Sequence, residues 1–436
     1  MRDNYSLRAP WMYVELAVVG IWFAMSFNCF GQNVQKPLNL DECLQAARSA
    51  PSAVTRARLQ TLSARRGVRA AQANFLPQLT LANSFTYNSP LLYAPGQFSF
   101  VALNGVHEYT SAIGTSLEVD TAGRLRAQLD RARADREIAD ASLTISDRDL
   151  VRSVTMAYYR VLLARKLAES AKENLNAARD FEDRVRHLEA GGEASRADLT
   201  KASLEVALLE RTAQASTLEA DLAAHDLASY WTTDVTAPVQ LMNDLDQPLA
   251  APPAANTDSP FLRRPEFKVL AGEETGFRAD ARQARSRMLP QLNLSFQYGI
   301  DSLHISTSDR GYAGFVHLDI PLFDWLRAHN EQKQFQFQAQ QVATDVIIAK
   351  RIYSKEYQDA LAMVSNSYAQ TSTTEQQLAL AKENLRLSLV RFEGGEGLAL
   401  DVVTSQTALA QAEIDYYSAR ANYLNAQSAL KVAGAE

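Results

Sequence analysis

Two stretches of the chain alternate between apolar and polar residues, which is the pattern of a β-strand. In the stretch 292–300 every other residue is apolar, and polar or small residues lie between them. The stretch 79–87 has the same alternation, with Asn83 as the one polar member of its apolar side. About ten residues with one apolar face that ends in aromatic residues are typical of a transmembrane β-strand. We therefore expect these two strands to face lipid through Leu79, Leu81, Phe85, Leu292, Leu294 and Phe296.

Shorter alternating stretches precede two long helical regions and predict two further strands. Their apolar positions are Ile113, Leu117 and Val119 in one, and Val316, Leu318 and Ile320 in the other. Four strands do not close a membrane barrel, because the smallest barrels have about eight. Open strand edges in lipid would leave backbone N–H and C=O groups unpaired. The pattern therefore predicts several chains that share one barrel. A β-sandwich packed against helices is the alternative, but it does not explain why the opposite strand faces are so polar and small.

The longest pattern in the chain is helical. From Leu150 to Ala178, small and apolar residues recur in alternating steps of four and three, the spacing of a coiled-coil seam. The regions 123–188 and 324–391 contain no proline, and at 1.5 Å per residue each would extend roughly 100 Å. Glycine pairs then interrupt the pattern, and helical runs follow at about 196–231 and 400–433. Each half is thus predicted to hold an antiparallel helical hairpin, with tips at Gly191, Gly192, Gly394 and Gly395.

Proline marks the points where the helical pattern changes to the alternating one. Pro77 lies in FLPQL (75–79) and Pro290 in MLPQL (288–292). Proline lacks an N–H group and disfavours helix in the residue before it, so both sites favour extended backbone. Pro321 follows the last predicted strand in the passage IPLFDWLRA. We expect these three prolines to mark the transition between the helices and the barrel wall.

The chain contains an internal duplication. FLPQLTL (75–81) corresponds to MLPQLNL (288–294), AKENL occurs twice, and GGEASRADL (191–199) corresponds to GGEGLALDV (394–402), all in the same order. We predict a first repeat at 32–232 and a second at 264–436, each with a helix, two strands and a long hairpin. Residues 233–263, rich in Pro, Asp and Asn, are predicted to be a linker.

The N-terminus carries the one long apolar run, at 11–30, after two arginines. With a possible cleavage site after Gly31, this run predicts a secretory signal peptide at 1–31. Glu15 within the run leaves an uncleaved N-terminal anchor as an alternative, and Cys29 leaves lipidation as another.

Composition excludes several classes of protein. The chain has 436 residues, is 47% hydrophobic and carries a net charge of −6, so no large basic surface indicates nucleic acid. It has no phosphate-binding loop, dinucleotide fingerprint or nucleophile elbow, which argues against an enzyme and against any catalytic residue. The six histidines lack metal-ligand spacing, so neither a metal nor another cofactor is expected. Cys43 is expected to be a small core residue.

These features together resemble the TolC family, the outer-membrane factors of bacterial efflux and type I secretion systems. The resemblance covers about 38–434 and rests on LNLDECLQAA, the repeated LPQL, IPLFDWLRA, RRPEF and the GG…D tips. It implies a homotrimer in which three chains of four strands each form a twelve-stranded barrel in outer-membrane lipid. It also implies a periplasmic tunnel of helices, whose tips dock a periplasmic adaptor (membrane fusion) protein and an inner-membrane transporter. The fold class is thus a mixed α/β membrane protein, a trimeric α/β-barrel.

The resemblance also implies a periplasmic gate at the tips. Asp401 matches an acid of the family's gating ring, and Thr404 stands where a second acid is often found. Asp198 matches an acid on the first hairpin that helps to lock the closed state. The polar partners of that lock correspond to Phe392 and Gly397 here, which cannot make the same links. Capping of the helices after the glycine turns is the other role open to Asp198 and Asp401.

A second hypothesis is a periplasmic coiled-coil scaffold or adaptor without a pore. It predicts strands that pack on helices and a protein that is soluble without detergent. The channel hypothesis predicts an oligomer that detergent extracts from the outer membrane. Transport through such a pore is passive, so the choice of cargo is expected to lie in the pump and the adaptor.

Overall fold

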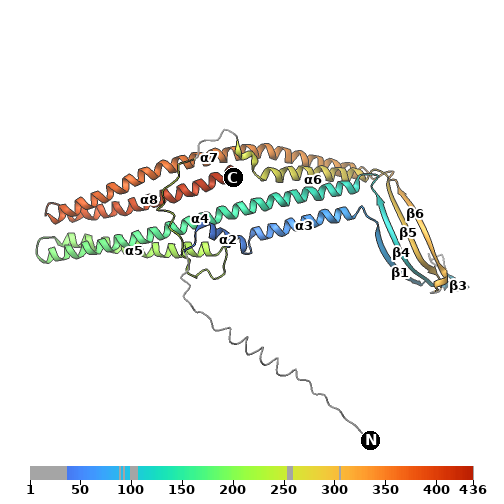
Figure 1. The fold of residues 1–436 in the computed structure, drawn as a ribbon, viewed down its shortest axis with the longest axis horizontal. Coiled ribbons are helices and arrows are strands. Elements are labelled where there is room, and N and C mark those ends of the chain that lie inside the picture. The colour runs from blue at the N-terminus through green and yellow to red at the C-terminus, as the bar shows by residue number, and fades with distance from the viewer. Residues whose placement is uncertain are drawn as a thin grey trace, which may run out of the picture.

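The chain is long and thin, with helices along most of its length and a sheet that turns away from them at one end (Figure 1). The predicted signal peptide at 1–31, with Cys29 and Gly31, lies outside the residues that are described. The computed structural model describes residues 37–87, 90–91, 94–98, 107–252, 259–303 and 306–435.

The main elements follow the same order in both halves of the chain: a helix, two long strands, a very long helix and a shorter helix. The first half contains α2 (Leu40–Ser49), α3 (Ala53–Ala73), β1 (Gln78–Tyr87), β2 (Pro90–Leu91), β3 (Ala94–Phe98), β4 (His107–Val119), α4 (Arg124–Ala190) and α5 (Arg196–Ala228). The second half contains η1 (Pro260–Arg263), α6 (Glu266–Ser286), β5 (Gln291–Ser302), η2 (Thr307–Asp309), β6 (Arg310–Asp319), α7 (Arg327–Glu393) and α8 (Ala399–Ala433).

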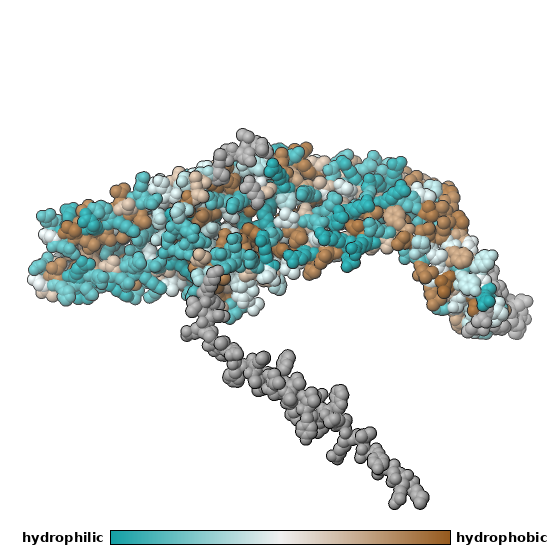
Figure 2. Space-filling model, viewed as in Figure 1, coloured by the Kyte–Doolittle hydropathy of each residue, from teal (hydrophilic) through white to brown (hydrophobic). Residues whose placement is uncertain are grey.

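The two longest helices, α4 and α7, give the molecule its length. Each has 67 residues and therefore extends about 100 Å. Of the α4 seam positions from Leu150 to Ala178, all but Ala157 are buried. Most of these side chains are alanine, so the neighbouring helix approaches closely and the assembly stays thin. At the surface, Figure 2 shows hydrophilic side chains over most of the helical body and apolar ones gathered where the helices meet the sheet.

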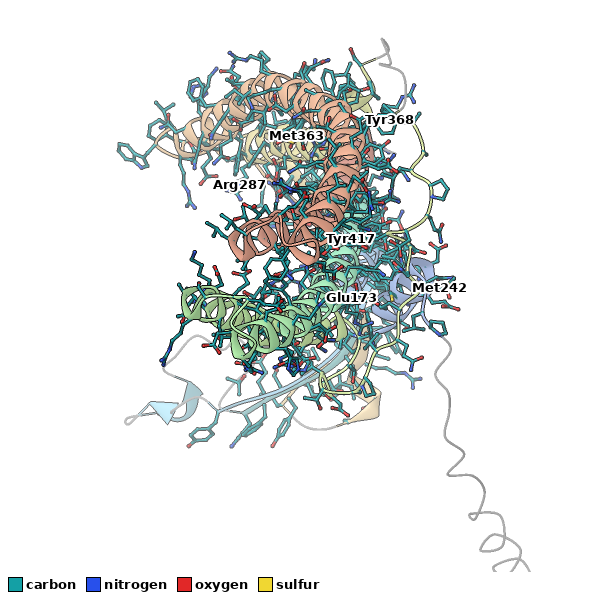
Figure 3. All side chains as sticks on the ribbon, turned by 90° about the vertical axis from the view of Figure 1, so that its left-hand side faces the viewer. Glu173, Met242, Arg287, Met363, Tyr368 and Tyr417 are labelled. Atoms are coloured by element: carbon teal, nitrogen blue, oxygen red, sulfur yellow. The ribbon has the colours of Figure 1, made fainter. Side chains whose placement is uncertain are left out.

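The four long strands form one antiparallel sheet in the order β1-β4-β5-β6, and β2 and β3 form a small second sheet. The central β4–β5 pair joins the two halves of the chain, with Leu117 opposite Leu294. At the end of the helices nearest the sheet, α3, α4, α6 and α7 neighbour one another in the same order as the four strands. Seen along the long axis, the helices form a curved layer (Figure 3).

The region that sequence predicts as a linker makes many contacts along its described part, 233–252, which we call the strap. Leu38 and the strap exchange backbone hydrogen bonds, from Leu38 N to Gln240 O (2.8 Å) and from Met242 N to Leu38 O (2.9 Å). The Leu245 side chain is fully buried in the main hydrophobic core. Arg420 of α8 donates to the carbonyl oxygen of Leu245. Because the hydroxyl of Tyr158 of α4 also donates to Asp244 of the strap (2.7 Å), the strap connects α4 of the first half with α8 of the second.

Candidate functional site

The strand register places most of the large apolar side chains of the four strands on one face of the sheet. Leu81 lies opposite Ile113, Ile113 opposite Tyr298, and Tyr298 opposite Tyr312. Residues that lie directly opposite one another point to the same face of a sheet. Alternation along each strand then puts the predicted lipid-facing residues together on this apolar face: Leu79, Leu81, Phe85, Leu292, Leu294 and Phe296.

The opposite face of the sheet is mostly polar and small, with Phe315 of β6 as the large apolar exception. Its central row runs from Thr80 through Gly114 and Gln297 to Ala313. At Gly299, on the same face, an added Cβ would lie 2.1 Å from the carbonyl oxygen of Ser111, so the backbone of β4 leaves no room for a side chain there. This face is suited to contact with water.

Neither face of the described sheet is covered by a helix (Figure 1). On the apolar face, Leu79 is 75% and Val316 is 74% exposed. Strands packed on helices, which both the sandwich and the scaffold hypotheses predict, are therefore not observed. In the described residues of one chain, β1 pairs with β4 alone and β6 with β5 alone. Each of these outer strands thus presents a backbone edge without a partner strand.

The predicted proline transitions lie between helix and strand. Pro77 separates α3 from β1, and Pro290 separates α6 from β5. After the first proline, the side-chain amide of Gln78 donates to the carbonyl oxygens of Ala73 (3.3 Å) and Leu76 (3.2 Å). The glutamine of the LPQL motif thus ties the start of β1 to the turn that ends α3. The hydroxyl of Thr121 donates to the carbonyl oxygen of Pro290 (2.9 Å), which ties neighbouring transitions together.

Both hairpin tips are glycine turns of the same type. Gly192 and Gly395 have φ values of 78° and 75°, a left-handed conformation in which glycine carries no Cβ penalty. The N–H of Glu193 donates to Leu188 O (2.8 Å), and the N–H of Glu396 donates to Arg391 O (2.9 Å). This is the Schellman pattern, which satisfies the last carbonyl groups of α4 and α7.

The three predicted gate residues lie in the helical turns that follow the tips. Asp198 accepts a hydrogen bond from the hydroxyl of Ser195 (2.6 Å), and its own N–H donates back to that hydroxyl (3.1 Å). The carboxylate of Asp401 lies 3.4 Å from the N–H of Leu398, and the hydroxyl of Thr404 donates to Leu400 O (2.8 Å). Both aspartates thus make capping contacts within one chain.

An apolar contact joins the two hairpins near their tips. The rings of Phe181 and Phe392 lie edge to face, with 5.1 Å between centroids, and Phe181 is 1% exposed. Val402 belongs to the same cluster. At Gly397, an added Cβ would lie 2.9 Å from the backbone nitrogen of Phe392, so the chain leaves no room for a larger side chain. At the two positions that correspond to the polar lock implied by the family resemblance, Phe392 thus packs on Phe181, and Gly397 lies against the backbone of Phe392.

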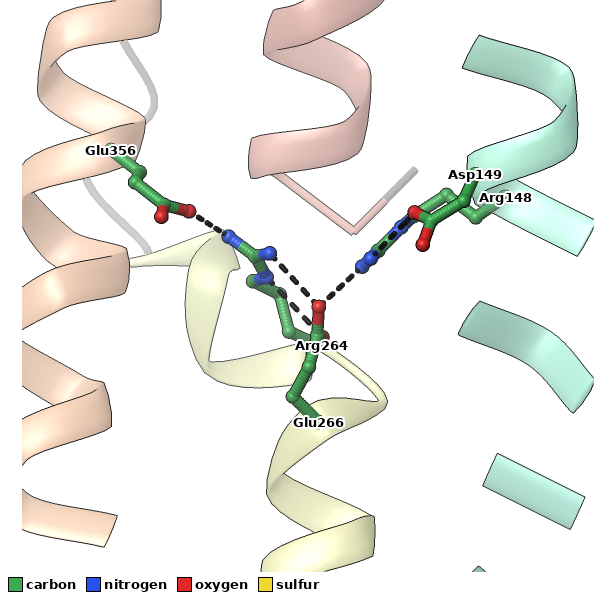
Figure 4. A network of polar contacts seen from close by, with 5 residues as sticks. All are labelled: Arg148, Asp149, Arg264, Glu266 and Glu356. Atoms are coloured by element: carbon green, nitrogen blue, oxygen red, sulfur yellow. Dashed lines mark hydrogen bonds and ion pairs between the residues drawn. The ribbon is translucent and has the colours of Figure 1, made fainter. Parts of the chain in front are cut away.

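A polar network that sequence reasoning missed lies midway along the helices (Figure 4). Arg264, from the RRPEF motif, pairs with Glu266 (2.9 Å) and with Glu356 of α7 (2.6 Å). Arg148 of α4 pairs with Glu266 (2.8 Å) and with Asp149 (3.0 Å). Burial alone would raise the pKa of Glu266, but its hydrogen bonds with Arg264 and Arg148 outweigh burial and lower it. The network links α4, α6 and α7.

The described residues contain no group of three or more His, Cys, Asp or Glu side chains placed to hold a metal ion. None of the helices in this described part combines the length and apolar character that a membrane crossing requires. Cys43 is fully buried, and this burial raises the pKa of its thiol to about 11. The prediction that Cys43 is a core residue is therefore confirmed.

Comparison with known proteins gives consistent matches along the chain. The model of the family described as "Outer membrane efflux protein" matches residues 43–231 and 261–435. The probable efflux pump outer membrane protein SepC of Pseudomonas putida is 24% identical over 334 residues, which cover 73% of this chain and 68% of that protein. The cobalt-zinc-cadmium resistance protein CzcC of Cupriavidus metallidurans is 27% identical over 317 residues, 70% of this chain and 72% of that one.

Solved structures show the same fold. The CmeC outer membrane channel of Campylobacter jejuni superimposes with a TM-score of 0.83 at 14% identity, covering 91% of this chain and 85% of that one. The outer membrane protein VceC of Vibrio cholerae gives a TM-score of 0.80 at 17% identity, covering 91% and 95% of the two chains.

Proposed function

The chain belongs to the outer membrane efflux protein family, and from that premise we propose that three copies form a channel-tunnel across the outer membrane and the periplasm. The protein is an outer-membrane efflux channel, and its relatives are transport proteins rather than enzymes. In the proposed assembly, three chains with four long strands each form one twelve-stranded barrel. The four helices that adjoin each sheet continue the barrel wall as a tunnel of twelve.

The observation that carries the proposal is the sheet, whose large apolar residues, apart from Phe315, share one face while no helix covers it. Apolar surface of this extent needs lipid, and the unpaired edges of β1 and β6 need partner strands because lipid offers no hydrogen bonds. Pairing β6 of one copy with β1 of the next satisfies both edges. The polar face then lines the lumen, and Pro77, Pro290 and Pro321 lie at the periplasmic boundary of the barrel.

The hairpin tips are the proposed periplasmic end of the tunnel. Three copies bring Asp401 and Thr404 around one axis, with Asp198 on the adjacent hairpin, and we assign the gate to these residues. The glycine turns at Gly191, Gly192, Gly394 and Gly395 are the proposed docking site for a periplasmic adaptor protein, which connects the channel to an inner-membrane transporter. In the proposed division of the chain, 1–31 is a signal peptide, 32–232 and 264–436 are the repeats, and 233–263 connects them.

Purification and electrical recording test the channel. We expect the protein to require detergent, to have the mass of three chains in native mass spectrometry, and to conduct ions in planar bilayers. A monodisperse protein that stays soluble without detergent and never conducts, even as Asp401→Ala, would contradict the proposal.

Labelling tests the two faces of the sheet independently of conductance. In a Cys43→Ala background, we expect Thr80→Cys and Asn293→Cys to react with a membrane-impermeant maleimide in reconstituted vesicles. The neighbouring Leu79→Cys and Leu292→Cys should be protected. The opposite pattern would place the apolar face toward water and refute the barrel.

A further inference from the structure

The two connections that lead from the sheet into the long helices differ in chemistry. In the first half, residues 120–123 read DTAG and join β4 to α4. In the second half, residues 320–326 read IPLFDWL and join β6 to α7. Strands β4 and β6 are both antiparallel to β5, so both connections leave the sheet at the same end. The duplication thus supplies an internal comparison, with one polar and one apolar segment in equivalent places.

The large apolar side chains of the connection at residues 320–326 are largely exposed. Leu322 is 94%, Trp325 is 85% and Phe323 is 68% exposed, and Leu322 is the most exposed large hydrophobic side chain in the described chain. The rings of Phe323 and Trp325 lie edge to face, 5.0 Å between centroids. This segment belongs to the region where Figure 2 shows apolar side chains at the bend between helices and sheet. Exposed apolar surface of this kind marks an interaction site.

The backbone of the connection is held in an unfavourable conformation. Trp325 and Leu326 have φ values of 56° and 59°, whereas the residue before α4 in the first half is Gly123, with φ of 75°. Left-handed backbone is unfavourable for residues other than glycine, and such strain persists where the surroundings compensate for it. The carboxylate of Asp324 accepts a hydrogen bond from the N–H of Ala328 (2.9 Å) and caps the start of α7. The turn therefore presents two aromatic rings to the surroundings at an energetic cost.

The apolar side chains of the connection continue the apolar face of the strand before it. On β6, Val316 and Leu318 belong to the apolar face of the sheet. Ile320 and Leu322 continue the same alternation, and both are exposed. Arg327, directly after the segment, and Arg287, at the end of α6, pair with the one carboxylate of Glu331, at 3.0 and 2.5 Å. With Asp324 in the turn, these side chains amount to two positive and two negative charges at the start of α7, and the Arg327 side chain stays 77% exposed.

We propose that residues 320–326 are an interfacial anchor that inserts into the periplasmic leaflet of the outer membrane. This inference rests on the proposed function, in which the apolar face of the sheet contacts lipid. Leu322 lies among the ends of the acyl chains nearest the headgroups, and the Trp325 ring lies at the headgroups, where tryptophan is enriched because its ring is apolar and its N–H is polar. The exposed guanidinium of Arg327 lies against lipid phosphates. Contact with lipid is what compensates for the exposed area and the strained turn.

Fluorescence of single-tryptophan proteins tests the anchor. The sequence has four tryptophans, at 11, 22, 231 and 325. The full-length triple variant Trp11→Phe/Trp22→Phe/Trp231→Phe keeps Trp325 alone. We reconstitute it in vesicles of phosphatidylcholine brominated near the headgroup end of the acyl chains, and expect emission about twofold or more below that in unbrominated vesicles. Bromination at the chain middle should quench less.

The matched control keeps Trp231 instead, as Trp11→Phe/Trp22→Phe/Trp325→Phe. Trp231 follows the end of α5, where Asp226 pairs with Arg160 of α4 (2.9 Å). That level is 36 residues along α4 from Arg124, about 54 Å from the sheet end of the helix. Trp231 should therefore be insensitive to brominated lipid, and equal quenching of both proteins would overturn the assignment of Trp325.

Conductance of the same vesicles separates the two proposals. Channels that conduct while Trp325 is unquenched by lipid and quenched by aqueous acrylamide overturn the anchor and leave the channel intact. Channels in which Trp325 is shielded from both quenchers show that a second copy of the chain covers the segment, which also overturns the lipid assignment. Vesicles without conductance or oligomer overturn the proposed function itself.

Discussion

The helical hairpins and the sheet differ in how far they bury their apolar side chains and pair their backbone N–H and C=O groups. Where α4, α5 and the strap meet, Val154, Leu227 and Leu245 are fully buried, whereas Leu79 on the sheet is 75% exposed. Backbone groups differ in the same way, because helices pair their own N–H and C=O groups and the outer strands present an open edge. The comparison shows that a single chain buries the core of its helical part, whereas its sheet leaves apolar side chains and strand edges exposed, which lipid and further copies would cover in the proposed assembly.

Truncating one leucine side chain in each region is the strongest test of this comparison. Leu227→Ala leaves a cavity in the core and should reduce the free energy of unfolding by about 2–5 kcal/mol. Leu81→Ala removes the same atoms from a side chain that is 65% exposed and should cost under about 1 kcal/mol. Denaturant unfolding in detergent, followed by circular dichroism, measures both. Equal costs would mean that the sheet has an apolar core of its own.

Adding a charge to either face of the sheet sharpens the comparison. Leu294→Arg places a guanidinium on the apolar face and should destabilise the folded oligomer in vesicles by about 2–4 kcal/mol, since lipid solvates charge poorly. The adjacent Ser295→Arg, on the polar face, should cost no more than about 1 kcal/mol. Urea titration of the oligomer in vesicles distinguishes them. A larger loss for Ser295→Arg would reverse the assignment of the faces.

The strap tests how far the helical part depends on contacts between distant segments. The hydroxyl of Tyr158 donates to the carboxylate of Asp244 (2.7 Å) and lies 3.1 Å from Met242 O. Tyr158→Phe leaves the partly buried carboxylate of Asp244 and the carbonyl oxygen of Met242 without this donor and should cost about 1–3 kcal/mol of unfolding free energy. Partly exposed Tyr230→Phe is the control and should change the thermal midpoint by under about 1 °C. If Tyr158→Phe behaves like the control, the strap does not hold the two halves together.

The smallest change in stability is expected at the tips, where substitutions of Asp401 separate its capping contact from its proposed role in the gate. Asp401→Asn keeps an oxygen that can accept from Leu398 N–H but removes the charge, so it should cost under about 1 kcal/mol. If the charge forms a gate, single-channel conductance in planar bilayers should rise in Asp401→Asn. Conductance that stays at the wild-type level, together with lower stability of Asp401→Ala, would leave Asp401 with capping alone.

Local patterns predict most of the elements correctly but not all of their limits. The second hairpin helix of the first half is predicted to reach about 231, yet α5 ends at Ala228. The long helix of the second half is predicted from 324, yet α7 begins at Arg327 because Trp325 and Leu326 are left-handed. Nothing in the helical spacing distinguishes these terminal residues, since the same side chains suit a helix or a turn. Helix ends are decided by the contacts around them.

The candidate site likewise contains some features that the sequence predicts and others that it does not. The glycine tips, the prolines and the alternating faces are visible in sequence because each depends on residues that are close together in the chain. The Arg264 network was missed because Arg148 and Glu356 lie on helices far from the RRPEF motif in sequence. The strap was missed because its composition is that of a linker, while its contacts come from α4 and α8.

Sequence by itself determined which segments are helices and strands, that the chain is duplicated, and where its hairpins turn. These follow from the 3.5- and two-residue periods and from the backbone freedom of glycine, which act over a few residues. Only the tertiary structure decided the register of β4 against β5, the course of the strap and the exposed turn at Trp325. Each of these joins segments whose partners lie far away in the chain, and no local pattern records the energy of such a contact.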